Sequence, residues 1–230
     1  MVKKILLVED DPSTRSMLSF ILKGEGFEVV TATDGRAAVH QFEAEPPDLV
    51  ILDMMLPEKS GFEVSRELRA SGRAQKTPIV ALTAKSDMTD RFQAFESGVD
   101  DFMTKPFDPQ ELLYRIKALL RLTAKSDDLG PESITAGPLT LYPPRLVVEV
   151  EGREVPLTRS EAALLKHFMA CPRAVFSAED LSNTVFPHKN STTDAVHAHI
   201  RNLRAKLEAD PKHPAIIITV GKRGYSFPSA

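Results

Sequence analysis

The sequence contains one cysteine, no tryptophan and no long apolar run. The single cysteine, Cys171, excludes a disulfide within the chain, and its neighbours do not form a zinc-binding pattern. We expect it to lie in the core at the end of a helix. The longest apolar runs have four or five residues, too few to cross a membrane, and residues 1–4 lead directly into a strand-like run. We therefore expect a cytoplasmic protein with no signal peptide and no membrane partner.

The composition is that of a globular protein with room for two domains. The 230 residues are 42% hydrophobic and 27% charged, with a net charge of -3. The charge is unevenly divided, because residues 1–122 carry 16 basic and 20 acidic side chains whereas residues 133–230 carry 12 and 9. An acidic first half and a mildly basic second half favour a nucleic-acid partner for the second half.

Five short apolar runs in the first half have the length of buried strands: 5–8, 28–31, 49–52, 79–82 and 102–103. Longer segments with helical apolar spacing separate them. Asp11-Pro12 and Asp108-Pro109 are typical helix starts, with an N-cap acid before a proline. This alternation predicts a doubly wound α/β fold, in which helices cover a five-stranded parallel sheet.

Polar side chains stand at the ends of these strands, and in a parallel sheet those ends share one edge. Glu9 and Asp10 follow the first strand, Asp53 the third, Thr83 the fourth and Lys105 the fifth. Singly, such residues also occur as helix caps or in solvated turns. Together, three carboxylates repel one another unless a cation lies between them, and Mg²⁺ prefers oxygen ligands of this kind. We expect a phosphoryl-transfer site in which Asp53 is the nucleophile, and Thr83 and Lys105 hold the phosphoryl oxygens.

Four motifs of this half match those of two-component receiver domains. They are Leu7-Val-Glu-Asp-Asp11, Leu52-Asp-Met-Met-Leu-Pro57 with Gly61, Ala81-Leu-Thr-Ala84, and Asp101-Phe-Met-Thr-Lys-Pro-Phe107. Residues 1–121 therefore resemble a receiver domain. The resemblance implies a flavodoxin-like sheet with the strand order 2-1-3-4-5.

The resemblance also implies roles for single residues. Asp53 would accept a phosphoryl group from a sensor histidine kinase, and the backbone carbonyl of Met55 would be a further Mg²⁺ ligand. Thr83 and Phe102 would be switch residues, and Lys105-Pro106 would be a cis peptide. The domain would assist its own phosphorylation and dephosphorylation without being an enzyme in the usual sense.

Residues 91–121 resemble the face through which OmpR/PhoB-type receivers dimerise when phosphorylated. The resemblance implies a dimer interface with five charged residues: Arg91, Asp100, Asp101, Glu111 and Arg115. Arg91 would pair with Glu111, and Asp101 with Arg115. Asp100 usually meets an arginine at the position where this chain has Leu122, and Arg121 is the candidate substitute. Exposed ion pairs contribute more to specificity than to affinity, and these charges also fit solvated helices.

Residues 122–132 are polar, contain Gly130-Pro131 and show no apolar period. We expect a linker there, between a receiver at 1–121 and a second domain at 133–230. Strand-like runs at 139–141, 146–150 and 154–155 then predict a small antiparallel sheet. Thr158 and Ser177 each open a capping-box pattern, and each predicts the start of a helix.

The segment 193–208 predicts a third helix with two different faces. Val196, Ile200, Leu203 and Leu207 recur at the spacing of a buried face. The other sides carry polar and basic residues: His197, His199, Arg201, Asn202, Arg204 and Lys206. A helix of this kind fits the major groove of DNA, although a solvated basic helix has the same pattern.

The chain ends in a predicted β-hairpin, 216–220 and 225–227, with the basic tip Gly221-Lys-Arg-Gly224. Together with the preceding helices, it resembles the winged-helix effector domain of OmpR/PhoB-type regulators. The matching positions are Leu157-Thr158, Glu161, Leu164-Leu165, Val196, His199-Ile200, Leu203-Arg204, Lys206-Leu-Glu208, Asp210-Pro211, Thr219-Val220 and Gly224-Tyr225. We expect Arg201 and Arg204 to contact bases or phosphates, with Asn202 beside them. His199 and Lys206 would contact the DNA backbone, and Lys222 or Arg223 the minor groove.

Several positions depart from the pattern of that effector domain. Asp194 stands where an arginine is usual, His197 replaces an aspartate, and Asn202 replaces a frequent arginine. Gly221 stands in the place of a wing arginine, and Phe186-Pro187 in the place of Trp-Gly. The fold implied by the resemblance tolerates these changes, whereas the family's base contacts do not carry over as a set.

We therefore expect a phosphorylation-activated DNA-binding regulator of transcription. Its partners would be a sensor histidine kinase, double-stranded promoter DNA, a second copy of the chain and, as a further candidate, RNA polymerase. The leading alternative is a regulator that uses its receiver only to dimerise, without phosphorylation. A haloacid-dehalogenase-type hydrolase would need a second acid where this chain has Met55. A further alternative is a winged helix that binds protein or RNA.

Overall fold

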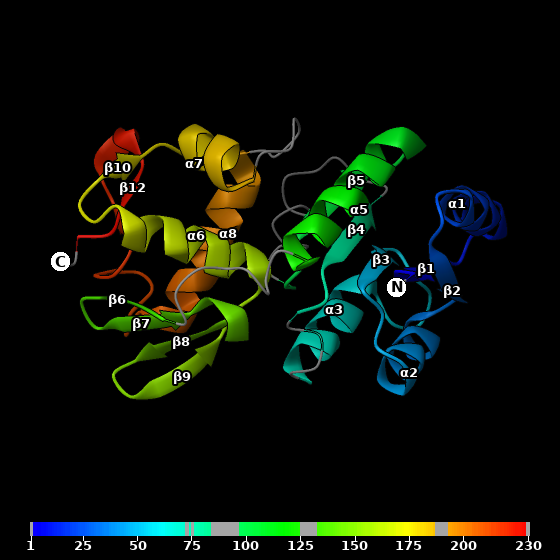
Figure 1. Cartoon of the computed structure of the whole chain (residues 1–230), viewed down its shortest axis with the longest axis horizontal. Coiled ribbons are helices and arrows are strands. Elements are labelled where there is room, and N and C mark those ends of the chain that lie inside the picture. The colour runs from blue at the N-terminus through cyan, green and yellow to red at the C-terminus, as the bar shows by residue number, and fades with distance from the viewer. Residues whose placement is uncertain are drawn as a thin grey trace. The chain divides into compact units, whose positions relative to one another are not determined.

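The computed structural model describes residues 2–71, 74, 76–83, 97–124, 133–186 and 193–228, with the backbone alone at 122–124. The chain divides into two compact units, residues 1–124 and 125–230 (Figure 1). The last helix of the first unit ends at Ala124. Residues 125–132 lie outside the described part, so the linker bounds of 122–132 stay a prediction.

The first unit alternates strands and helices. In chain order they are β1 (Lys4–Val8), α1 (Pro12–Gly24), β2 (Glu28–Ala32), α2 (Gly35–Ala44), β3 (Leu49–Asp53), α3 (Gly61–Ala70), β4 (Ile79–Thr83), β5 (Asp101–Thr104) and α5 (Pro109–Ala124). All five expected strands are present. Residues 84–96, between β4 and β5, lie outside the described part.

The strands of this unit form one parallel sheet in the order β2-β1-β3-β4-β5. This confirms the flavodoxin-like order. The helices α1 and α5 lie on one face of the sheet, and α2 and α3 on the other (Figure 1). Every residue of β3 and β4 is buried, which is why these strands read as continuous apolar runs.

The described residues of the second unit form two antiparallel sheets and three α-helices. In chain order its elements are β6 (Ile134–Ala136), β7 (Leu139–Tyr142), a 3₁₀ turn (Pro143–Arg145), β8 (Val147–Val150), β9 (Arg153–Pro156), α6 (Arg159–Ala170), β10 (Val175–Phe176), α7 (Ala178–Val185), α8 (Thr193–Leu207), β11 (Ile218–Thr219), a 3₁₀ turn (Gly221–Arg223) and β12 (Tyr225–Ser226). The sheets have the orders β6-β7-β8-β9 and β10-β12-β11. Side chains of α6 and α8, among them Phe168 and Ile200, fill the core of this unit.

Capping side chains begin the helices where the sequence predicted. Asp11 accepts a hydrogen bond from Thr14 N at 2.7 Å, with Pro12 as the first residue of α1. Complete capping boxes stand at Thr158 and Ser177. Each cap satisfies amide groups that the helix itself leaves without partners.

Two short strands and the exposure of Cys171 differ from what the sequence predicted. The sequence pattern did not indicate β6 or β10, which have three and two residues. Cys171 caps the C-terminus of α6 as expected, but its side chain is exposed and not part of the core. Among the described residues, no helix combines the length and the apolar character needed to span a bilayer.

Candidate functional site

Asp53 lies at the carboxyl end of β3, in contact with a lysine that follows β5. Its Oδ2 atom lies 2.5 Å from Lys105 Nζ, and its Oδ1 atom accepts a hydrogen bond from Met55 N at 2.8 Å. Lys105 Nζ also donates to Glu9 Oε2 at 2.7 Å. Asp53 is 3% exposed and Glu9 is fully buried, so one ammonium group bridges two carboxylates that are almost removed from water.

The charged groups of this cluster shift one another's pKa values. Burial raises the pKa of Glu9, the hydrogen bond from Lys105 lowers it, and the charge of Asp53 raises it further. For Lys105, burial opposes the charged form, but the hydrogen bonds to Asp53 and Glu9 hold its pKa above the ordinary value. Lys105 is therefore fixed as a cation between the two acids.

Glu9, Asp10 and Asp53 can act together as ligands of a metal ion. Each offers a carboxylate oxygen, and these three oxygens lie within 4.8 Å of one another. Asp10 is exposed, so the site is open to solvent on one side. An all-oxygen donor set with an open side fits Mg²⁺, which keeps water molecules and phosphate oxygens among its ligands. The role of the Met55 carbonyl as a further ligand stays a prediction.

Neighbouring strands bring the other predicted residues to the same edge. Thr83, the last residue of β4, is 3% exposed, and its carbonyl accepts a hydrogen bond from Lys105 N at 2.7 Å. Lys105-Pro106 is a cis peptide, as predicted. Phe102, on β5, is 8% exposed, so its ring is already largely buried.

Arg15 and Gly61 also support this edge of the sheet, in roles that the sequence motifs did not predict. Arg15 Nη1 donates to the carbonyls of Glu9 at 2.8 Å and Asp10 at 3.0 Å, and so holds the acidic loop. This role of Arg15 could have been predicted, because Arg15 lies in the first turn of the helix that Asp11 caps, close to the acidic loop. A Cβ atom at Gly61 would lie 2.2 Å from the Asp53 carbonyl, so only glycine lets α3 approach β3 this closely.

In the second unit, α8 and the hairpin of β11 and β12 present basic groups to solvent. The helix matches its predicted range to within one residue. Arg201 is exposed on it, and Lys222 and Arg223 are exposed at the tip of the hairpin. Asn202 is partly exposed. It lies on α8 between the exposed Arg201 and Leu203, which faces the core.

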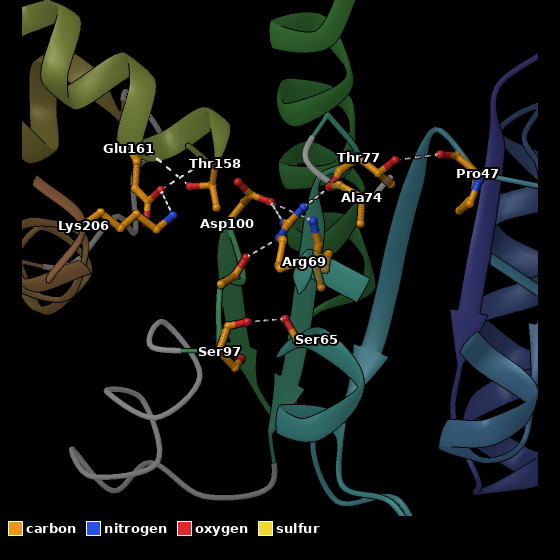
Figure 2. Close-up of polar contacts among 12 residues, drawn as sticks. Pro47, Ser65, Arg69, Ala74, Thr77, Ser97, Asp100, Thr158, Glu161 and Lys206 are labelled. Atoms are coloured by element: carbon orange, nitrogen blue, oxygen red, sulfur yellow. Dashed lines mark hydrogen bonds and ion pairs between the residues drawn. The ribbon is translucent and has the colours of Figure 1, made fainter. Parts of the chain in front are cut away.

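Two residues expected to contact the DNA backbone lie elsewhere. His199 is 2% exposed, and its ring lies 5.3 Å from that of Phe186, because its position on α8 faces the core. Lys206 Nζ donates to Glu161 Oε2 at 2.6 Å and to the carbonyl of Pro156 at 3.2 Å. The Glu161 side chain is 1% exposed, so Lys206 supplies the charge that this buried acid needs (Figure 2).

Arg204 also makes its hydrogen bonds within the second unit. Its Nε donates to the carbonyl of Ile217 at 2.8 Å and its Nη2 to Thr219 Oγ1 at 2.8 Å. Its guanidinium carbon lies 5.6 Å from the centre of the Tyr225 ring. Arg204 therefore fastens α8 to β11 and β12, which differs from the base or phosphate contact that the sequence favoured.

Comparison with known protein families covers both units. Residues 5–117 match the response regulator receiver domain, and residues 152–227 match the C-terminal domain of transcriptional regulatory proteins. The DNA-binding response regulator MtrA of Mycolicibacterium smegmatis is 39% identical over 226 residues, which are 98% of this chain and 96% of that protein. The chain belongs to the OmpR/PhoB-type response regulators.

Further relatives match over nearly the full length of the given chain. The DNA-binding dual master transcriptional regulator RpaA of Synechocystis is 36% identical over 96% of this chain and 93% of its own length. Among solved structures, a RitR mutant has 25% identity and a TM-score of 0.77, with 98% of each chain covered. DrrB of Thermotoga maritima, described as an OmpR/PhoB homolog, has 29% identity and a TM-score of 0.50, with 99% of each chain covered. The family consists of transcriptional regulators, not of enzymes that turn over a substrate.

Arg115, which was expected at the dimer interface, contacts two other residues expected there, Asp101 and Glu111, within one receiver domain. Arg115 Nη1 lies 2.7 Å from both carboxylate oxygens of Asp101, and its Nη2 lies 2.8 Å from Glu111 Oε1. Burial opposes the charge of Arg115, but Asp101 and Glu111 hold its pKa above the ordinary value. Arg91 lies outside the described residues, so its expected pairing with Glu111 stays a prediction.

Asp100 lies inside the receiver and not on its surface. Its side chain is 2% exposed, and Oδ2 accepts hydrogen bonds from Arg69 Nη2 at 2.6 Å and from Ile79 N at 2.9 Å. Arg69, on α3, also donates to the carbonyls of Gly98 and Thr77, each at 2.8 Å (Figure 2). The side chain of Leu122 lies outside the described part. The expectation that Asp100 lines a dimer interface therefore does not fit its buried position.

Proposed function

We propose that this response regulator controls transcription through phosphorylation of Asp53 by a sensor histidine kinase. The observation that carries the proposal is the contact of Lys105 with both Asp53 and Glu9, at the sheet edge where Asp10 completes an acidic cluster. A lysine beside the acceptor carboxylate would offset the negative charge that a phosphoryl group brings to Asp53. The output would come from the winged helix of the same chain.

In the transfer step, an oxygen of Asp53 attacks the phosphorus of a phosphohistidine. The new bond joins Asp53 oxygen to phosphorus, the phosphorus–nitrogen bond breaks, and the imidazole leaves with the electron pair. Met55 N holds the second oxygen of Asp53, so the attacking oxygen has a fixed orientation. When bound by Glu9, Asp10 and Asp53, Mg²⁺ would offset the negative charge of the carboxylates and of the incoming phosphoryl group.

After transfer, the residues around Asp53 respond to the new charge. Lys105 already lies against Asp53, and it would remain as the cation beside the phosphoryl oxygens. The hydroxyl of Thr83 would move to donate a hydrogen bond to the same group, and Phe102 would adjust beside it. The receiver would in this way assist its own phosphorylation and the later hydrolysis of the aspartyl phosphate.

The regulator would then act on double-stranded promoter DNA in the cytoplasm. We assign DNA contacts to Arg201 and Asn202 on α8 and to Lys222 and Arg223 on the hairpin, since these side chains reach solvent. Phosphorylation would favour a homodimer, and pairing of two receivers raises the effective concentration of two winged helices on adjacent half-sites. RNA polymerase is the partner through which the bound dimer would change transcription.

The proposal is tested by measuring duplex affinity before and after treatment with a small acyl phosphate and Mg²⁺. The probe is a duplex that the treated wild-type chain enriches from a random-sequence library. Treatment should tighten binding by the wild type and leave Asp53→Asn unchanged. Equal affinities before and after treatment of the wild type would instead support a regulator whose receiver only dimerises.

A further inference from the structure

A pair of side chains joins α8, the proposed recognition helix, to the wing, which is the hairpin of β11 and β12 with its tip at residues 221–224. Nδ1 of His197, in the first half of α8, lies 2.6 Å from the hydroxyl of Tyr225 at the start of β12. The two rings are 5.8 Å apart and inclined at 64°, so the contact is made edge to face. Either tautomer of His197 allows a hydrogen bond, because the phenol can donate or accept.

We propose that His197 is a positioning residue that sets the place of the wing relative to the recognition helix, and thereby the base preference on the wing side of the DNA site. This inference rests on the proposed DNA binding. The wing is held from two points on α8, and His197 is the point nearer to the start of the helix.

The second point is Arg204, two turns further along α8. It holds the backbone of Ile217 and the side chain of Thr219, on the strand that pairs with β12. Its guanidinium also lies over the ring of Tyr225. Burial raises the pKa of Tyr225, so its hydroxyl keeps its proton in the contact with His197.

Tyr225 offers His197 a fixed partner because the backbone around it has little freedom. Its strand pairs with both β10 and β11, with Tyr225 opposite Phe176 on one side and Thr219 on the other. A Cβ atom at Gly224 would lie 1.9 Å from the Phe176 carbonyl, so the chain passes β10 at a distance that only glycine permits. The hydroxyl of Tyr225 is thus held by the sheet, and His197 ties α8 to it.

The position of the wing matters because its tip carries Lys222 and Arg223. A helix in the major groove and a hairpin tip at the neighbouring minor groove read one site only if their separation is fixed. Without the contact between His197 and Tyr225, Arg204 would be the remaining point that ties α8 to the hairpin. The free protein would then sample a wider range of wing positions relative to α8, and DNA binding would have to narrow that range.

The experiment compares His197→Ala, Tyr225→Phe and the double variant on the duplex that the wild type enriches from a random library. Each single change should weaken binding about threefold to tenfold, the range for one lost hydrogen bond. The double variant should bind no more weakly than the weaker single one, since both changes remove the same contact. Base preference should relax on the wing side of the site only, and the salt dependence should stay that of the wild type because no phosphate contact is lost.

Two further variants separate positioning from other roles. His197→Asn, whose amide can reach the position of Nδ1, should recover most of the base preference. His213→Ala, an exposed histidine outside α8 and the wing, should bind as the wild type does. Melting temperatures are measured for every variant, and a loss of affinity that follows a loss of global stability would overturn the inference.

Other results would also overturn it. Normal binding by Tyr225→Phe, with weak binding and a shallower salt dependence in His197→Ala, would mean that His197 contacts the DNA itself. If the wild type enriches no duplex and shows no salt-dependent affinity for DNA, the proposed DNA binding fails, and the role of His197 fails with it.

Discussion

Arg69 holds the carboxylate of Asp100 inside the receiver, with Nη2 2.6 Å from Oδ2. The guanidinium reaches from α3 across to the start of β5, and its other hydrogen bonds go to backbone carbonyls, including those of Gly98 and Thr77. The acid that the family resemblance placed at a dimer interface is therefore satisfied within its own domain. Among the described residues, Arg69 and the backbone of Ile79 both bind its Oδ2 atom.

Arg69→Ala should lower the free energy of unfolding of the receiver by about 3 kcal/mol, because it leaves the buried Asp100 carboxylate without its cation. Urea denaturation of the full chain measures the loss. Arg66→Ala, one turn earlier on α3 and exposed, is the matched control and should have little effect. Equal effects of the two changes would show that the contact between Arg69 and Asp100 does not stabilise the receiver.

Lys206→Met should destabilise the effector unit by about 2 kcal/mol, because Glu161 then keeps a buried charge without a partner. The loss should be smaller than for a fully buried pair, since the Lys206 side chain is 34% exposed. Lys212→Met, a change at an exposed lysine, provides the comparison. Unchanged stability together with weaker duplex binding would return Lys206 to the DNA-contacting role that the sequence suggested.

Asp194→Arg should raise duplex affinity across sequences and steepen its salt dependence by about one phosphate contact. Asp194 lies in the first turn of α8, where an acid stabilises the helix, so the same change should cost about 0.5 kcal/mol of stability. Asp194→Asn separates the two effects, because it removes the repulsion without adding a cation. Affinity that stays constant at low and high salt would place Asp194 away from the phosphates.

Mg²⁺ should stabilise the metal-free protein, by about 2.7 kcal/mol at a concentration one hundred times its Kd. Asp10→Asn should weaken this gain, because it removes one of the three carboxylates that lie within 4.8 Å of one another. Thermal unfolding at increasing Mg²⁺ measures both, with Glu43→Gln as an exposed acid outside the cluster. The same Mg²⁺ dependence in all three proteins would mean that Asp10 is not a ligand.

The receiver could be predicted from the sequence in detail because its signals are local. Buried parallel strands such as β3 and β4 are short apolar runs, and Asp11 and Asp108 mark helix starts directly. The candidate site could be predicted from the order of the strands, because parallel strands bring Glu9, Asp53 and Lys105 to one edge of the sheet.

The effector side chains were harder to predict because helical spacing shows only which positions share a face. His199 follows the exposed His197 by two residues, yet its position faces the core. Lys206 reaches Glu161 across 45 residues of sequence, and Arg69 reaches Asp100 across 31. No local pattern shows such partners, and strands as short as β10 leave no period to detect.

Intact-mass measurement after incubation with a small acyl phosphate and Mg²⁺ tests most directly whether Asp53 accepts the phosphoryl group. We expect one phosphoryl adduct on the wild type and on Glu43→Gln, and none on Asp53→Asn. An adduct that persists in Asp53→Asn would contradict the assignment of the acceptor. No adduct on the wild type, under conditions that phosphorylate another receiver, would contradict phosphorylation as the signal that controls this regulator.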